Sequence, residues 1–141
     1  MSVLAPRPAA PSDLDWIEPL SRRRFAAAWS RASLEAELTR PDSLFLVVKE
    51  RGYLLARLSE DGCAVLDFAV AEDGLGWGRA LWACAVAEAG RRGVRRLTLE
   101  VSSANARALA FYAKAGATVV GRRAKFYTDG SDAVLMDVAL P

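Results

Sequence analysis

A glycine-rich segment in the middle of the chain has the residue types of an anion-binding loop. It lies between an apolar run predicted as a strand and a segment predicted as a helix, and its residues are Gly74, Leu75, Gly76, Trp77, Gly78 and Arg79. Glycines let the backbone approach a phosphate, and the first N–H groups of a helix have no partners within it. The segment therefore predicts a phosphate-binding loop or a flexible strand-to-helix turn. Asp73, just before it, would repel a phosphate, although an acid before a helix is also ordinary capping chemistry.

A dinucleotide-binding motif is the main competing interpretation of this loop. Glu100 lies near the end of the next predicted strand, where such sites carry an acid that binds ribose. The third glycine of a GxGxxG motif counted from Gly74, however, falls on Arg79. The chain is also too short for a doubly wound sheet, so this interpretation is disfavoured.

Glu100, Asn105 and Tyr112 follow the loop as further polar candidates. Glu100 lies on the polar side of an alternating strand, where a carboxylate has a role, an ion-pair partner or access to solvent. Asn105 suits the cap of the next helix. Tyr112 lies two helical turns further on, on nearly the same face, and could equally be an ordinary core residue.

Composition excludes several classes of protein. The chain has 141 residues, a net charge of +2 and no histidine, which rules out Ser-His-Asp and Cys-His catalysis and histidine-built zinc sites. Without histidine we expect no metal site, and because the net charge is small we expect no direct nucleic-acid partner. No apolar stretch is long enough for a membrane helix, and the N-terminus does not resemble a signal peptide. The free cysteines Cys63 and Cys84 fit the cytoplasm.

Hydrophobic periodicity predicts a single α+β domain spanning residues 1–141. We expect an edge strand over 3–10, a helix after Ser12 that Pro19 kinks or shortens, and a second helix over 30–38. A hairpin over 44–56 follows them and comes before the remaining elements. These are strands over 63–70, 94–101, 118–122 and 133–140, and helices from Gly78 to about 90–93 and over 106–115.

The order and spacing of these pieces resemble the GNAT superfamily of acetyl-CoA-dependent N-acetyltransferases, and within it the RimI branch of ribosomal-protein alanine N-acetyltransferases. The likeness runs from about Trp29 to Met136. The pieces that carry it are Ala69-Val70, Gly76 to Leu81, Leu99-Glu100-Val101, Asn105, Ala108, Tyr112, Gly116, Arg123, Phe126-Tyr127 and Asp132 to Met136. The resemblance implies a GNAT fold, a mixed, mostly antiparallel central sheet flanked by helices.

The resemblance also implies a direct-transfer mechanism and a role for each candidate residue. Glu100 would act as general base and Tyr112 as general acid. The backbone of Phe68, Ala69 and Val70 would lie along the pantetheine arm of acetyl-CoA, Gly74 to Arg79 would hold the pyrophosphate, and Asn105 would contact the cofactor. The acceptor would be a protein N-terminus, with a ribosomal protein as one candidate, or a small amine, and the enzyme a monomer or homodimer.

The sequence departs from the family pattern in the phosphate loop. Asp73 stands where the family has Gln or Arg, and the segment between Val70 and Gly76 is two residues shorter than usual. This departure motivates a second hypothesis, a non-catalytic GNAT-fold protein that binds partners. Two basic clusters are interpreted as solvated helix surface, Arg22–Arg24 and Arg91–Arg96. The alternative for Arg22–Arg24 is the rim of the substrate groove, and for Arg91–Arg96 a contact with a CoA phosphate, an acidic protein or ribosomal RNA.

Overall fold

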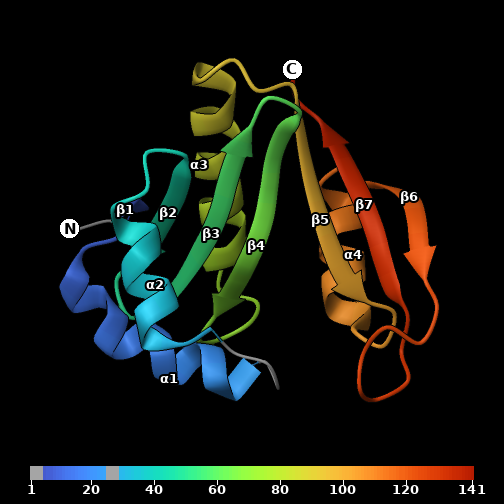
Figure 1. Ribbon diagram of the computed structural model, residues 1–141, viewed down its shortest axis with the longest axis horizontal. Coiled ribbons are helices and arrows are strands. Elements are labelled where there is room, and N and C mark those ends of the chain that lie inside the picture. The colour runs from blue at the N-terminus through green and yellow to red at the C-terminus, as the bar shows by residue number, and fades with distance from the viewer. Residues whose placement is uncertain (1–4, 25–28) are drawn as a thin grey trace.

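The computed structural model describes residues 5–24 and 29–141. Within them the chain forms one central sheet with helices on both faces (Figure 1). The first half contains β1 (Arg7–Pro8), a short 3-10 turn (Pro11–Asp13), α1 (Leu14–Arg24), α2 (Arg31–Leu38), β2 (Ser43–Val48), β3 (Gly52–Ser59) and β4 (Gly62–Val70). The second half contains α3 (Trp77–Arg91), β5 (Arg96–Ser102), α4 (Ala106–Lys114), β6 (Thr118–Arg123) and β7 (Ala133–Ala139).

The sheet has the strand order β1-β2-β3-β4-β5-β7-β6, and every neighbouring pair is antiparallel except β4 with β5. The parallel pair is held by only two residue pairs, Cys63 with Leu97 and Ala64 with Thr98. Beyond them β4 and β5 diverge toward the lower edge of the view in Figure 1. The sheet is therefore split into two halves that meet only at one end of these strands.

Two apolar clusters cover the two faces of the sheet. The larger one joins β2 to β5 and β7 with α3 and Tyr112 of α4, and Leu81, Ala89 and Leu97 are fully buried within it. The smaller one packs α1 and α2 on the opposite face, around Ile17 and Leu34. Successive side chains along a strand point to opposite faces of the sheet, so neighbouring strand residues belong to different clusters.

Side-chain caps fix where the helices begin. Ser30 accepts a hydrogen bond from the N–H of Ser33 (3.1 Å) ahead of α2. Asn105 does the same for Ala108 (3.1 Å) ahead of α4, which confirms its predicted cap. Gly76 precedes α3 in the left-handed conformation, with φ of 86°.

The predicted elements are confirmed in kind and order, with two differences. The first strand covers only Arg7–Pro8, although it does lie at the sheet edge; residues 3 and 4 of the predicted strand are outside the described residues. The expectation that Pro19 shortens the first helix was wrong, because α1 continues through Pro19 to Arg24. The ring of Pro19 is on the exposed side of the helix, so its missing N–H leaves no buried group without a partner.

Asp13 ties the N-terminal segment to α1. Its buried carboxylate accepts hydrogen bonds from the Arg7 guanidinium (2.8 and 3.0 Å), the N–H of Ala10 (2.8 Å) and the indole of Trp16 (3.0 Å). Burial alone would raise the pKa of Asp13, but these hydrogen bonds and the charge of Arg7 outweigh it and lower the pKa to about 2. A lowered pKa means that the ionised carboxylate stabilises the fold.

We expect Asp13→Ala to destabilise the protein at neutral pH by about 2 kcal/mol or more, because the shift is roughly two pKa units and the hydrogen bonds are lost as well. In the unaltered chain this contribution should be complete above pH ~4 and should disappear as the pH falls toward 2. Urea unfolding from pH 2 to pH 7 measures it. Asp15→Ala is the control, since that neighbouring side chain is exposed. Equal losses in both variants would contradict the assignment.

Candidate active site

The free edge of β4 is the first component of the site. The N–H of Ala71 donates to the carbonyl of Arg51 (2.7 Å), and Tyr53 lies opposite Ala69 in the register. Because hydrogen-bonded and non-bonded pairs alternate in an antiparallel ladder, the backbone groups of Phe68 and Val70 point away from β3. They face the side where β5 has diverged, so an extended ligand can bond to them as an added strand would.

The glycine-rich loop joins this free edge to α3. Helical bonding begins at Ala80, whose N–H donates to the carbonyl of Gly76 (3.0 Å), so the three N–H groups before it have no acceptor within the helix. Gly74 and Gly76 both have positive φ, and a Cβ on either would meet no atom within 4 Å, so the loop is open on its outer side. This geometry suits a phosphate group at the start of α3.

Asp73 lies between two arginines of different helices. Its Oδ2 is 3.7 Å from Nη1 of Arg24 in α1 and 3.4 Å from Nη1 of Arg107 in α4. The negative charge that argued against phosphate binding is therefore accompanied by two positive charges. Arg79, on the first turn of α3, is exposed beside the same loop.

Glu100 lies on β5 beyond the point where β4 and β5 separate. The alternation is as predicted, because Leu97, Leu99 and Val101 are buried whereas Glu100 is exposed. Its side chain is on the face opposite to α3 and α4, so it reaches solvent without the cost of burial. The half-buried Tyr127 lies near it: burial first, and then the charge of Glu100, raises the pKa of the Tyr127 phenol.

Tyr112 approaches from the other face. It is buried on α4 within an aromatic cluster, with its ring centroid 6.5 Å from Phe68, 5.5 Å from Trp82 and 5.5 Å from Phe111. Burial raises the pKa of the phenol, and the negative charge of Asp67 raises it further. The hydroxyl is thus protonated at neutral pH and able to donate. The contact with Phe68 brings Tyr112 to the free edge of β4, whereas Glu100 lies across β5 and does not touch it.

Asp67 and Tyr53 form a buried pair that the sequence analysis missed. The Tyr53 hydroxyl donates to Oδ2 of Asp67 (2.8 Å), and both side chains are buried on the α1 side of the sheet. Burial raises the pKa of Asp67 to about 6, although the hydrogen bond from Tyr53 holds it down. The available signal was the carboxylate itself, in the middle of the apolar run over 63–70.

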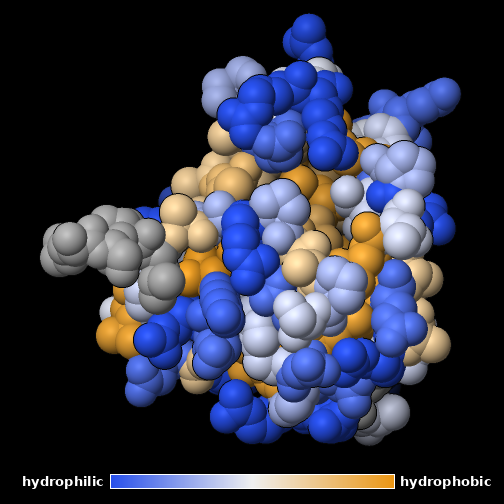
Figure 2. Space-filling view, turned by 90° about the vertical axis from the view of Figure 1, so that its left-hand side faces the viewer, coloured by the Kyte–Doolittle hydropathy of each residue, from blue (hydrophilic) through white to orange (hydrophobic). Residues whose placement is uncertain are grey.

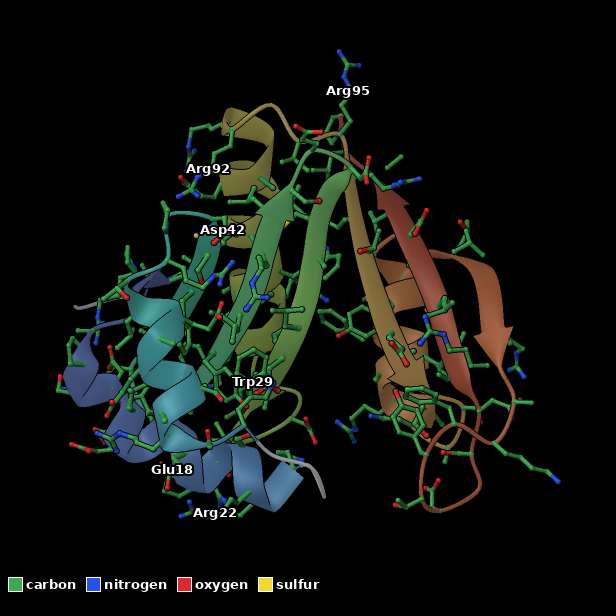
Figure 3. The ribbon with its side chains drawn as sticks, in the orientation of Figure 1. Glu18, Arg22, Trp29, Asp42, Arg92 and Arg95 are labelled. Atoms are coloured by element: carbon green, nitrogen blue, oxygen red, sulfur yellow. The ribbon has the colours of Figure 1, made fainter. Side chains whose placement is uncertain are left out.

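The second basic cluster lies far from the loop. Arg91, Arg92, Arg95 and Arg96 are at the opposite end of α3, about 22 Å away at 1.5 Å per helical residue. Figure 2 shows hydrophilic side chains gathered at this upper end, and in Figure 3 Arg95 points away from the molecule. Glu88 pairs with both Arg91 and Arg92. The interpretation as a solvated helix end therefore fits better than a contact with the loop's ligand.

Trp29 and the Arg22–Arg24 run lie on the α1 side of the sheet. Trp29, labelled in Figure 3, is half-buried against the smaller apolar cluster, as a core tryptophan would be. Arg22 pairs with Glu18 one turn earlier (2.5 Å). Arg24 instead reaches the end of β4, so the members of this basic run do not share one role.

A sheet split between two parallel strands, with a free strand edge and a glycine loop at the split, defines the class of enzymes that bind a phosphate-bearing, extended cofactor along a strand. Residues 13–117, about three quarters of the chain, match the Acetyltransferase (GNAT) family. The chain belongs to this family of acetyltransferases, whose acetyl donor is acetyl-CoA. The expected fold and cofactor are thereby confirmed.

Two relatives support this assignment over nearly the whole chain, and a third shares the fold. A protein of Bacillus subtilis (strain 168), provisionally named a ribosomal protein bS18-alanine N-acetyltransferase, is 29% identical over 136 residues, which is 91% of this chain and 90% of that one. The crystal structure of the ribosomal-protein-S18-alanine N-acetyltransferase from Escherichia coli has a TM-score of 0.86 at 26% identity, covering 96% of this chain and 93% of that one. The PaiA N-acetyltransferase from Thermoplasma acidophilum, solved with coenzyme A, shares the fold (TM-score 0.80, 20% identity, 98% and 99% covered).

The chain's own residues fit acetyl-CoA. The edge of β4 at Phe68 and Val70, whose backbone groups bond to neither β3 nor β5, suits the amide-bearing pantetheine arm, although the Val70 carbonyl already accepts from Arg24. The open glycine loop with its free N–H groups suits the pyrophosphate. Among residues 5–24 and 29–141 no group of side chains could hold a metal ion. No helix in this part of the chain is long and apolar enough to cross a membrane.

We expect the Asp67 carboxylate to make stability depend on pH. Its pKa is raised on folding, so its favourable contribution is complete below pH ~4 and is lost as the pH rises through about 6. Between pH 4 and 7 the unaltered chain should lose up to about 3 kcal/mol relative to Asp67→Asn. Urea unfolding at several pH values measures the difference. Asp61→Asn, an exposed acid ahead of the same strand, should run parallel to the unaltered chain. A parallel course for Asp67→Asn would contradict the shift.

Proposed function

We propose that this enzyme transfers acetyl from acetyl-CoA directly to a protein N-terminal α-amine. The observation that carries the proposal is the arrangement around the split sheet. An exposed carboxylate, Glu100, lies on one face of β5, a protonated phenol, Tyr112, approaches from the other, and the free edge of β4 lies alongside. A base for the amine and an acid for the thiolate thus serve opposite sides of one reacting carbon.

The geometry of the loop and the strand supports the cofactor contacts in this proposal. The stretch of β4 formed by Phe68, Ala69 and Val70 lies along the pantetheine arm, and an N–H of Phe68 or Val70, which point away from β3, polarises the thioester carbonyl. The residues from Gly74 to Arg79 hold the pyrophosphate at the start of α3. Asn105 uses its side-chain oxygen to cap α4, which leaves its amide N–H₂ available to the cofactor.

Acetyl-CoA supplies the acetyl group as a thioester. As the amine nitrogen forms its bond to the carbonyl carbon, Glu100 accepts the proton that the amine loses, through a water molecule. Tyr112 gives its proton to the sulfur as the carbon–sulfur bond breaks. An α-amine has a pKa of about 7.7–8.0, so a modest base is sufficient. The buried Tyr112 phenol stays protonated at neutral pH, so its proton is available to the sulfur as the carbon–sulfur bond breaks.

The acceptor is assigned from the relatives that are named ribosomal-protein alanine N-acetyltransferases. Both cover more than nine tenths of this chain, so the likeness includes the segments that flank Glu100 as well as the cofactor half. A ribosomal protein with an N-terminal alanine is therefore the first candidate substrate. The reaction is assigned to the cytoplasm, where such a substrate is made.

We expect Tyr112→Phe to lower kcat about a hundredfold or more while binding of CoA persists, because the ring remains in the aromatic cluster and only the donor is lost. Steady-state kinetics and calorimetry with CoA measure the two effects. Tyr127→Phe is the control, since it removes a phenol near Glu100 rather than at the edge of β4. An unchanged kcat in Tyr112→Phe would remove the assigned acid.

We expect Glu100→Gln to lower kcat/KM most at the pH where the acceptor amine is largely protonated. Above pH ~9 the amine loses its proton without help, so the defect should shrink. A pH–rate profile from 6.5 to 9.5 tests this, with Glu60→Gln, an exposed acid in a distant turn, as control. A defect of constant size across the range would indicate a structural role instead.

We expect peptides with N-terminal alanine to be acetylated at the α-amine in preference to polyamines and amino acids. A panel of peptides that differ in the first residue, assayed beside these small amines, measures the preference. Faster turnover of small amines would favour the small-molecule alternative. Absence of both turnover and micromolar CoA binding would favour the non-catalytic alternative.

A further inference from the structure

Asp73 connects the two halves of the split sheet at the mouth of the cofactor site. It follows β4 in one half, and it is paired with Arg107 of α4 in the other. On its own side it is paired with Arg24, the last residue of α1. A single carboxylate therefore holds two guanidinium groups across the opening where β4 and β5 separate.

Arg24 is also bonded to the backbone that the cofactor needs. Its Nε and Nη2 donate to the carbonyl of Val70 (3.1 and 2.8 Å), and Nη2 also donates to the carbonyl of Ala71 (3.2 Å). These carbonyls lie where the free edge of β4 meets the glycine loop. The guanidinium of Arg24 is thus within reach of any phosphate at the start of α3.

The two ion pairs of Asp73 are weak enough for another anion to replace its carboxylate. Their lengths of 3.4 and 3.7 Å exceed those of good charge-assisted hydrogen bonds, and the Arg107 side chain is 71% exposed. Such partly solvated ion pairs are weak. A pyrophosphate carries more charge and more acceptor oxygens than a carboxylate, and arginine matches it better.

We propose that Asp73 is an internal stand-in for a cofactor phosphate. It holds Arg24 and Arg107 at the mouth of the site until the pyrophosphate of CoA displaces its carboxylate and takes the two guanidinium groups. Asp73 then faces the pyrophosphate as a repelling charge, so its presence lowers the affinity for the cofactor. This inference rests on the use of acetyl-CoA and is independent of the acceptor amine.

The test is the dissociation constant of CoA, measured by calorimetry for Asp73→Asn. Asparagine has the same shape without the charge, so CoA should bind about three- to tenfold more tightly. Glu72→Gln is the matched control. It removes the same charge from the adjacent exposed position, which has no ion pair among the described residues. The thermal midpoints of both variants show whether the fold is retained.

Two further measurements test whether the change in CoA affinity arises at the pyrophosphate. Inorganic pyrophosphate should compete with CoA more strongly in Asp73→Asn than in the unaltered chain, whereas pantetheine, which has no phosphate, should compete equally in both. Arg107→Ala should weaken CoA binding, and the gain from Asp73→Asn should shrink when the two changes are combined, because one of the released guanidinium groups is absent.

Unchanged or weaker binding of CoA by Asp73→Asn would overturn the proposal. Equal tightening by Glu72→Gln would also overturn it, since the effect would then belong to the net charge of the loop. Failure of the unaltered chain to bind CoA would overturn the cofactor assignment together with this inference. That outcome differs from one in which CoA binds but Asp73→Asn does not tighten its binding.

Discussion

The structure depends on how little β4 and β5 pair with each other. Two residue pairs join them, at Cys63–Leu97 and Ala64–Thr98, and the strands then diverge. If pairing continued, the backbone groups of Phe68 and Val70 would be consumed by β5 and nothing could bind along that edge. An unpaired strand edge inside a protein is costly unless something satisfies it. Here Arg24 satisfies part of it by bonding to the Val70 carbonyl. The catalytic proposal and the proposal for Asp73 with Arg24 and Arg107 both depend on this open edge.

The elements could be predicted from sequence because each is encoded locally. Alternation placed Leu97, Leu99 and Val101 inside and Glu100 outside, and the cap at Asn105 fixed the start of α4. The error at Pro19 has a tertiary cause, since propensity alone leaves out the burial of Ile17 and Leu20 of α1 in the core, which offsets the lost helical hydrogen bond. The family resemblance named the candidate site residues, but their roles remain proposals.

Contacts between elements far apart in sequence could not be predicted. The extent of strand pairing, the Tyr53–Asp67 hydrogen bond and the two arginines around Asp73 each join residues that no local pattern relates. Asp73 shows the consequence most clearly. Taken alone, its charge argued against phosphate binding, and the short loop suggested a degraded site. With Arg24 and Arg107 beside it, the three side chains together carry no excess of negative charge, so Asp73 does not by itself argue against a phosphate at this loop.

Tyr112 shows that burial in the core is compatible with the catalytic role proposed for it. Because β4 and β5 share so few pairs, the back of the split must be closed by side chains, and the aromatic cluster of Phe68, Trp82, Phe111 and Tyr112 does so from β4, α3 and α4. The rings fix α4 against β4 and exclude water. That burial keeps the Tyr112 phenol protonated, and the contact with Phe68 holds it at the strand edge where the thioester would lie. The packing that closes the split sheet is therefore the same packing that positions the proposed proton donor, and we expect a change that loosened the cluster to displace the Tyr112 phenol before it unfolded the domain.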